Sequence, residues 1–139
     1  MMRYVFDTDH LSLSQRGYEP LRSRIEQHVA DQLAVTIVTV EEQLRGRLAQ
    51  IRKAISPAQL AQSYHWLGET FGTLAQLEVL HFNEAATRIY TDLLRRKLRT
   101  GTQDLRIAAI VLAHESILVT RNTQDFTGIA ELRLEDWTI

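Results

Sequence analysis

The sequence contains no cysteine, only two prolines and no long apolar run among its 139 residues. Without cysteine the chain forms neither disulfides nor thiolate metal sites, which agrees with the reducing cytoplasm where we expect the protein to work. No stretch is apolar enough for a membrane span, and the start MMRYVFD lacks the continuous apolar segment of a signal peptide. We therefore expect a soluble protein with no membrane partner.

The charge balance is also nearly neutral, with 16 basic and 17 acidic residues. The chain therefore has no global positive field that would attract nucleic acid, and any polyanion has to bind at local patches. The length suits one domain with a sizeable core and is too short for two ordinary ones. We predict a single domain that spans residues 1–139.

Strand-like and helix-like segments alternate along the chain. Strands are predicted at 3–6, 34–38, 77–82, 117–120 and, weakly, 131–135. A turn leading into a helix is predicted at 7–15, and helices are predicted at 18–32, 40–55, 57–74, 83–97 and 104–115. Thr39 and Asn83 are candidate caps, and Ser56-Pro57 ends one helix and starts the next. Such alternation requires crossover connections and a parallel sheet that helices cover on both faces. The predicted class is α/β, a three-layer α/β/α fold with a short, mostly parallel sheet of about five strands.

Acidic side chains stand where predicted strands end or helices begin. They are Asp7 and Asp9 after the first strand, Glu41 and Glu42 after the second, Asp104 at a helix start, and Asp125 after the fourth strand. In a parallel sheet these positions share one edge, where ligands of open α/β sheets bind. Convergence of the carboxylates should raise the pKa of at least one of them. An oxygen-only site suits Mg²⁺ or Mn²⁺, which predicts metal-dependent attack on a phosphodiester.

A purely structural explanation exists for several of these acids. The helix dipole favours a carboxylate in a first helical turn, which would account for Glu41, Glu42 and Asp104. Asp7 is harder to explain as a helix cap, because Thr8 and Asp9 compete for that position. We choose Glu42 over Glu41 for the site, since Gly46 lies one turn away on the same face and permits close approach.

Four segments resemble, in order and spacing, the acidic motifs of the PIN-domain family, in particular the VapC-type toxin ribonucleases of bacterial toxin-antitoxin pairs. The segments are YVFDTDHLS, TVEEQLRG, TQDLRIAAIVLAH and LVTRNTQDF, and the resemblance covers essentially the whole chain. Carried over residue by residue, the catalytic and metal-binding carboxylates of the family fall on Asp7, Glu42, Asp104 and Asp125. The same transfer makes Thr8, Thr120 and Asn122 the supporting polar residues.

The resemblance implies a PIN-like fold and an endoribonuclease that depends on Mg²⁺ or Mn²⁺ and hydrolyses RNA phosphodiester bonds. It also implies a toxin that a small DNA-binding antitoxin inhibits, and a homodimer. Family proteins often carry asparagine where this chain has Asp9, so Asp9 is not included among the ligands.

Two other functions remain open from the sequence. A non-catalytic PIN-like module that binds RNA or protein would share the fold, although it would not need all four carboxylates. A phosphatase of the haloacid dehalogenase type would explain the DTD after the first strand. That chemistry needs a late lysine, and no lysine follows Lys97, since Arg121 and Asn122 follow the fourth strand instead.

The arginines allow two interpretations, and the histidines are not predicted to bind a metal. The run RRKLR at 95–99 either interacts with a helix dipole or contacts RNA phosphates. Arg45, Arg47 and Arg121 lie nearer the sheet edge where the acids are predicted, and they either contact phosphates there or are solvated surface residues. The five histidines share no metal-ligand spacing, and His10, although near Asp7, is not included in the site.

Overall fold

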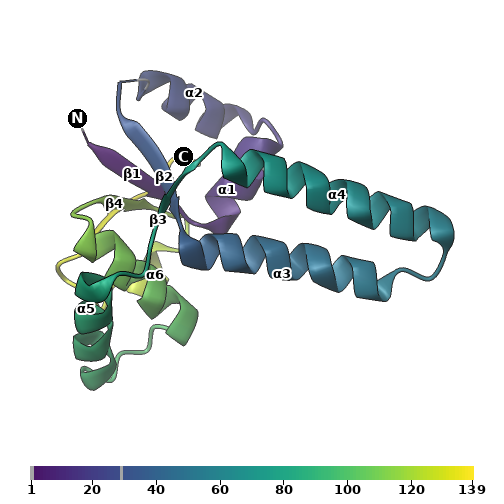
Figure 1. Ribbon diagram of the computed structural model, residues 1–139. Coiled ribbons are helices and arrows are strands. Elements are labelled where there is room, and N and C mark those ends of the chain that lie inside the picture. The colour runs from purple at the N-terminus through teal and green to yellow at the C-terminus, as the bar shows by residue number, and fades with distance from the viewer. Residues whose placement is uncertain (1, 29) are drawn as a thin grey trace.

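A five-stranded sheet forms the centre of the computed structural model, which describes residues 2–28 and 30–139 (Figure 1). The strands are β1 Arg3–Phe6, β2 Gln32–Thr36, β3 Glu78–Leu80, β4 Ile117–Val119 and β5 Arg133–Glu135. Their order is β3-β2-β1-β4-β5, and each neighbouring pair is parallel. The predicted α/β class and its short parallel sheet are confirmed.

Helices cover both faces of this sheet, because successive strand residues point to opposite sides. The helices are α1 Thr8–Gln15, α2 Glu19–Gln27, α3 Ile37–Lys53, α4 Pro57–Ala75, α5 Glu84–Arg95 and α6 Thr102–Ala113, with the short 3-10 helix η1 at Thr123–Phe126. Val5 and Leu118 belong to the core that contains α5 and α6, whereas Phe6 and Val119 belong to the core that contains Leu11 of α1. Each fully buried side chain of this kind contributes about 1.5–3 kcal/mol, so the two cores fix the sheet between its helical layers.

The helices α3 and α4 form a long hairpin that runs away from the sheet (Figure 1). The Ser56 side chain accepts a hydrogen bond from the Gln59 backbone N–H, and Pro57 begins α4, as predicted. Within the hairpin, the Arg47 guanidinium lies 5.8 Å from the centre of the Trp66 ring, which is 40% exposed. None of the helices in the described part of the chain is long and apolar enough to cross a membrane.

Several predicted boundaries differ from the observed ones. The helix predicted at 18–32 ends at Gln27, and the chain is already in β2 at Gln32. Val29, which falls within the predicted range, lies outside the described residues. The strand predicted at 34–38 ends at Thr36, whose hydroxyl accepts from the Thr39 backbone N–H at 3.1 Å. Thr36 rather than Thr39 is therefore the cap of α3. Asn83 caps α5 as predicted.

Candidate active site

Asp7 lies where the strand order reverses, at the end of β1 and next to the end of β4. It is the N-cap of α1, with its Oδ1 accepting from the His10 backbone N–H at 2.8 Å. Its Oδ2 accepts from the Thr120 hydroxyl, directly after β4, at 2.6 Å. Asp7 therefore takes the cap position alone, without Thr8, and its carboxylate is fixed between two strand ends.

Glu42 approaches the same edge from α3. Its Oε2 accepts a hydrogen bond from the Thr8 hydroxyl at 3.1 Å. Burial raises the pKa of Glu42, the Thr8 hydrogen bond lowers it in part, and the charges of Asp104 and Asp7 raise it further. Its neighbour Glu41 instead pairs with Arg45. The structure thus places Glu42 among the other carboxylates.

Asp104 and Asp125 complete the acidic edge. Asp104 lies in the first turn of α6, and its pKa is raised first by burial and then by the charges of Asp125 and Asp7. Asp125 lies in η1 and is exposed. Repulsion between converging acids was predicted to raise at least one pKa; the pKa values of Glu42 and Asp104 are raised, with burial as the largest cause and the neighbouring carboxylates as a smaller one. We call Asp7, Glu42, Asp104 and Asp125 the acidic edge.

Asn122, two residues after Thr120, extends this hydrogen-bond network. The Asn122 backbone N–H donates to the Thr120 hydroxyl at 3.1 Å, and its side-chain amide donates to Asp9 Oδ2 at 3.3 Å. Thr120 thus contacts Asp7 directly, whereas Asn122 reaches Asp7 only through the Thr120 hydroxyl, and its own amide contacts Asp9. Asp9 is engaged by Asn122 and contributes to neither raised pKa.

His10 contacts the site although we did not include it. It is fully buried, and its ring Nδ1 lies 3.3 Å from Asp7 Oδ1. The sequence signal for this contact is that His10 follows Asp7 by three residues, the spacing between a helix cap and the backbone N–H that it accepts from. Its second ring contact is with the backbone N–H of Trp137, 127 positions away, which no local pattern reveals.

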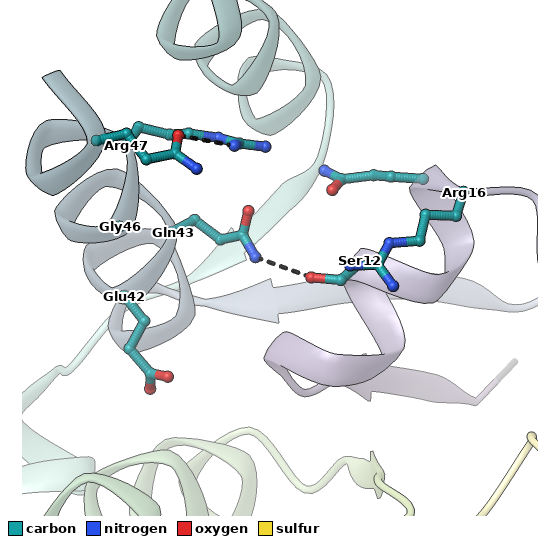
Figure 2. Close-up of a pocket in the computed structure, with 8 residues that line it drawn as sticks. Ser12, Arg16, Glu42, Gln43, Gly46 and Arg47 are labelled. Atoms are coloured by element: carbon teal, nitrogen blue, oxygen red, sulfur yellow. Dashed lines mark hydrogen bonds between the residues drawn. The ribbon is translucent and has the colours of Figure 1, made fainter. Parts of the chain in front are cut away.

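Two hollows flank the acidic edge. The first, the α1–α3 groove, has a volume of about 380 Å³ and is lined by Ser12, Gln15, Arg16, Glu42, Gln43, Gly46, Arg47 and Gln50. Figure 2 shows Gln43 reaching towards Ser12 across the groove, while the Glu42 carboxylate points away from Arg47. The second, the α5–α6 cleft, has a volume of about 780 Å³ and is lined by Lys97, Leu98, Arg99, Thr100, Gly101, Asp104, Gln124, Asp125, Thr127 and Gly128. Both hollows thus combine cationic side chains with a member of the acidic edge.

The donor atoms at this edge are carboxylate and hydroxyl oxygens, which suit a hard divalent cation. Within residues 2–28 and 30–139, no three histidine or acidic side chains lie close enough together to hold a metal ion as they stand. The acids are nevertheless near enough to shift one another's pKa values, so a cation between them would relieve their repulsion. The donor chemistry therefore fits Mg²⁺ or Mn²⁺.

The fold and the site together define an α/β protein with an oxygen-rich acidic site at the carboxyl edge of a parallel sheet. No family model matches the chain. Ribonuclease VapC2 of Rickettsia felis is 31% identical over 94 residues, which are 65% of this chain and 69% of that protein. The chain belongs to the VapC ribonuclease family.

Other relatives extend the similarity over the full length. The tRNA(fMet)-specific endonuclease VapC of Salmonella typhimurium is 24% identical, with 99% of both chains covered. A solved structure of VapBC2 from Rickettsia felis, bound to a DNA fragment from their promoter, has a TM-score of 0.75 at 25% identity over 98% of this chain and 99% of that one. VapBC-1 from nontypeable Haemophilus influenzae shares the fold, with a TM-score of 0.78 at 24% identity over 99% and 100%. Membership of a nuclease family does not favour the binding-module and phosphatase alternatives.

Proposed function

We propose that this protein is the toxin of a toxin-antitoxin pair, an endoribonuclease that depends on Mg²⁺ or Mn²⁺. The observation that carries the proposal is the acidic edge, where four segments of the chain bring carboxylates together and the pKa values of Glu42 and Asp104 are raised. Carboxylates in a cleft whose pKa values are raised by burial and by neighbouring charges are candidates for a functional site. We also propose that residues 1–139 act as one nuclease domain.

In this proposal, Asp7, Glu42, Asp104 and Asp125 are the catalytic and metal-holding residues. The Thr120 hydroxyl fixes Asp7, the Thr8 hydroxyl fixes Glu42, and Asn122 orients Thr120. The chemistry that Mg²⁺ or Mn²⁺ supplies in such a site is activation of water and neutralisation of charge on the phosphodiester.

Cationic side chains in the two hollows are proposed to bind the RNA backbone. Lys97 and Arg99 line the α5–α6 cleft together with Asp104, and Arg16 and Arg47 line the α1–α3 groove together with Glu42. Phosphate contacts on both sides of the acidic edge would hold an RNA strand across it, which a chain of net charge −1 achieves only through such local patches.

The proposed partners follow from the structural relatives. VapBC from Salmonella typhimurium and VapBC2 from Rickettsia felis were both solved bound to DNA. We propose that this chain likewise binds a small DNA-binding antitoxin, forms a homodimer and acts in the cytoplasm. Trp66, with 40% of its surface exposed on the α3–α4 hairpin, is a candidate anchor for one of these protein contacts.

Cleavage of a mixed RNA pool tests the enzymatic part. The protein should cleave in Mg²⁺ or Mn²⁺ and stop in excess EDTA. Asp104→Asn should reduce cleavage on the order of 100-fold or more, the size typical of removing one electrostatic group from an active site. Asp92→Asn, which alters an exposed acid on α5, is the matched control and should cleave like the wild type. Undiminished cleavage in EDTA would contradict the metal requirement.

Expression in bacteria tests the toxin part. The protein alone should arrest growth, whereas Asp104→Asn should not, and co-expression of the adjacent small gene should restore growth. Sequencing of RNA ends after brief induction would identify the cleaved RNA. Normal growth with abundant soluble wild-type protein and intact RNA would favour the non-catalytic binding module instead.

A further inference from the structure

His10 connects Asp7 to the C-terminal segment of the chain. The imidazole is fully buried beside Phe6, with the ring centres 6.1 Å apart. Its Nδ1 lies 3.3 Å from Asp7 Oδ1, and its Nε2 accepts a hydrogen bond from the Trp137 backbone N–H at 3.3 Å. Trp137 is itself fully buried, so this backbone donor is held firmly in place.

The Trp137 contact determines which ring nitrogen carries the proton. The chain fixes the direction of a backbone N–H, so the nitrogen that faces it has to present a lone pair. With the lone pair on Nε2, the ring hydrogen lies on Nδ1, which is the nitrogen that faces Asp7. The nearest other acid, Asp136, lies 3.8 Å from Nε2, and its Oδ1 already accepts from the backbone N–H and the hydroxyl of Thr138.

Both oxygens of the Asp7 carboxylate are consequently held by donors. Oδ1 receives the backbone N–H of His10 at 2.8 Å and faces the imidazole Nδ1, while Oδ2 receives the Thr120 hydroxyl at 2.6 Å. A carboxylate held at both oxygens cannot rotate freely about its terminal bond. Its remaining lone pairs keep a fixed direction.

We propose that His10 is a positioning residue, which donates from Nδ1 to Asp7 and so orients this carboxylate for a divalent cation. The inference rests on the proposed metal-dependent function and adds a residue to it. Donors around a metal-binding carboxylate orient it, and their loss typically weakens metal affinity by roughly 10–100-fold. Here the orientation is set from the far end of the chain, because the Trp137 backbone selects the tautomer that can donate.

Three substitutions at His10 separate positioning from packing. His10→Asn places an amide nitrogen where Nδ1 was and keeps the donor towards Asp7. His10→Gln places its amide near the former Nε2 and keeps only the acceptor for Trp137, whereas His10→Leu keeps neither. His114→Gln is the control, since the His114 ring Nδ1 contacts only the Ile110 backbone carbonyl within its own helix end.

Isothermal titration calorimetry of each protein with Mn²⁺ measures the affinities that decide between positioning and packing. His10→Asn and His114→Gln should bind Mn²⁺ close to the wild-type affinity, and His10→Gln and His10→Leu roughly 10–100-fold more weakly. Equal affinity in all of the folded His10 variants would overturn the positioning role. Failure of the wild type itself to bind Mn²⁺ would overturn the proposed metal-dependent function instead.

A measurement on the wild type keeps the inference testable if a His10 variant does not fold. Nitrogen-15 NMR of histidine-labelled protein distinguishes a protonated ring nitrogen from one with a free lone pair. We expect His10 to show a protonated Nδ1 and an unprotonated Nε2. A proton on Nε2 would overturn the inference, because Nδ1 would then have no hydrogen to donate to Asp7.

Discussion

At the acidic edge Asp104 and Glu42 face other carboxylates, whereas at the end of α5 the Arg96 guanidinium lies between Asp92 and Glu131. Burial and neighbouring negative charges raise the pKa of Asp104. Hydrogen bonds from Arg96 lower the pKa of Glu131 to about 2. We call the half-buried cluster uncompensated, because none of its carboxylates is hydrogen-bonded to an arginine or lysine among the described residues, and the exposed cluster balanced, because both of its acids are hydrogen-bonded to Arg96.

The difference shows which cluster stabilises the metal-free fold. Arg96 donates two hydrogen bonds to Glu131, at 2.9 and 2.6 Å, and two to Asp92, at 3.1 and 2.8 Å. In the described part of the chain, no lysine or arginine donates a hydrogen bond to a carboxylate of the acidic edge, and the hydroxyls that donate to Asp7 and Glu42 carry no charge. Half-buried like charges cost the fold free energy, and a cation bound among them would offset that cost.

The largest expected effect is that of Mn²⁺ on the stability of the wild type. A ligand that binds only the native state adds about 2.7 kcal/mol at 100 times its dissociation constant, so Mn²⁺ should raise the melting temperature. Asp104→Asn should show a much smaller rise, because one ligand is lost. Glu131→Gln in the balanced cluster should keep the full rise. Equal rises in Asp104→Asn and the wild type would mean that Asp104 does not bind the ion.

A smaller effect is expected from Asp104→Asn in metal-free protein. The folded-state pKa of Asp104 is raised, so its protonated form stabilises the fold below the unfolded pKa, and this contribution is lost as pH rises through the folded pKa. At pH 7 the ionised carboxylate therefore opposes folding. Asp104→Asn should therefore unfold at a higher urea concentration than the wild type, with a gain of up to about 1 kcal/mol in the free energy of unfolding. The gain is small because partial exposure screens the repulsion and because the helix dipole favours the carboxylate that is removed.

The pH series sharpens the same comparison. The gain of Asp104→Asn over the wild type should disappear below about pH 4, where Asp104 is protonated in both states. Asp92→Asn is the control and should change stability in the opposite sense, since it removes a partner of Arg96. A variant Asp104→Asn that is less stable than wild type at pH 7 would mean that the helix dipole outweighs the repulsion.

Much of the acidic edge was predictable because it depends on strand order in the chain and on local turns. Once the sheet is parallel, acids at strand ends and helix starts share one edge, which placed six acids there in the prediction. The resemblance to the PIN-domain family then selected Asp7, Glu42, Asp104 and Asp125 from them. The cap Asn83 and the helix boundary at Ser56-Pro57 were equally local, and both Ser56 and Asn83 accept from a backbone N–H three residues later.

What the sequence did not reveal depends on distant contacts or on competition between neighbours. Thr36 and Thr39 are both plausible caps, and only the structure shows that Thr36 accepts the hydrogen bond. His10 is near Asp7 in any interpretation, but its tautomer depends on Trp137, which packing of the C-terminal segment places beside it. The pairing of Arg96 with Glu131 likewise joins residues 35 positions apart.

The smallest expected effect belongs to this last pair. Glu131 has a lowered pKa in the folded state, so the stability that it contributes is present above the unfolded pKa of about 4.3 and is lost as pH falls towards about 2. Its carboxylate is about half exposed, so screening limits the contribution, and Glu131→Gln should cost roughly 0.2–1 kcal/mol at pH 7. The cost should shrink in high salt and vanish near pH 2, in urea unfolding measured at each pH.

Glu84→Gln, which removes the single bond to Arg88 on the same helix, is the matched control and should cost less, since Arg96 holds Glu131 through two hydrogen bonds. A cost for Glu131→Gln that is independent of both pH and salt would show that Glu131 stabilises the protein by packing and not by charge, and the contrast between a balanced and an uncompensated cluster would then rest on Asp104 alone.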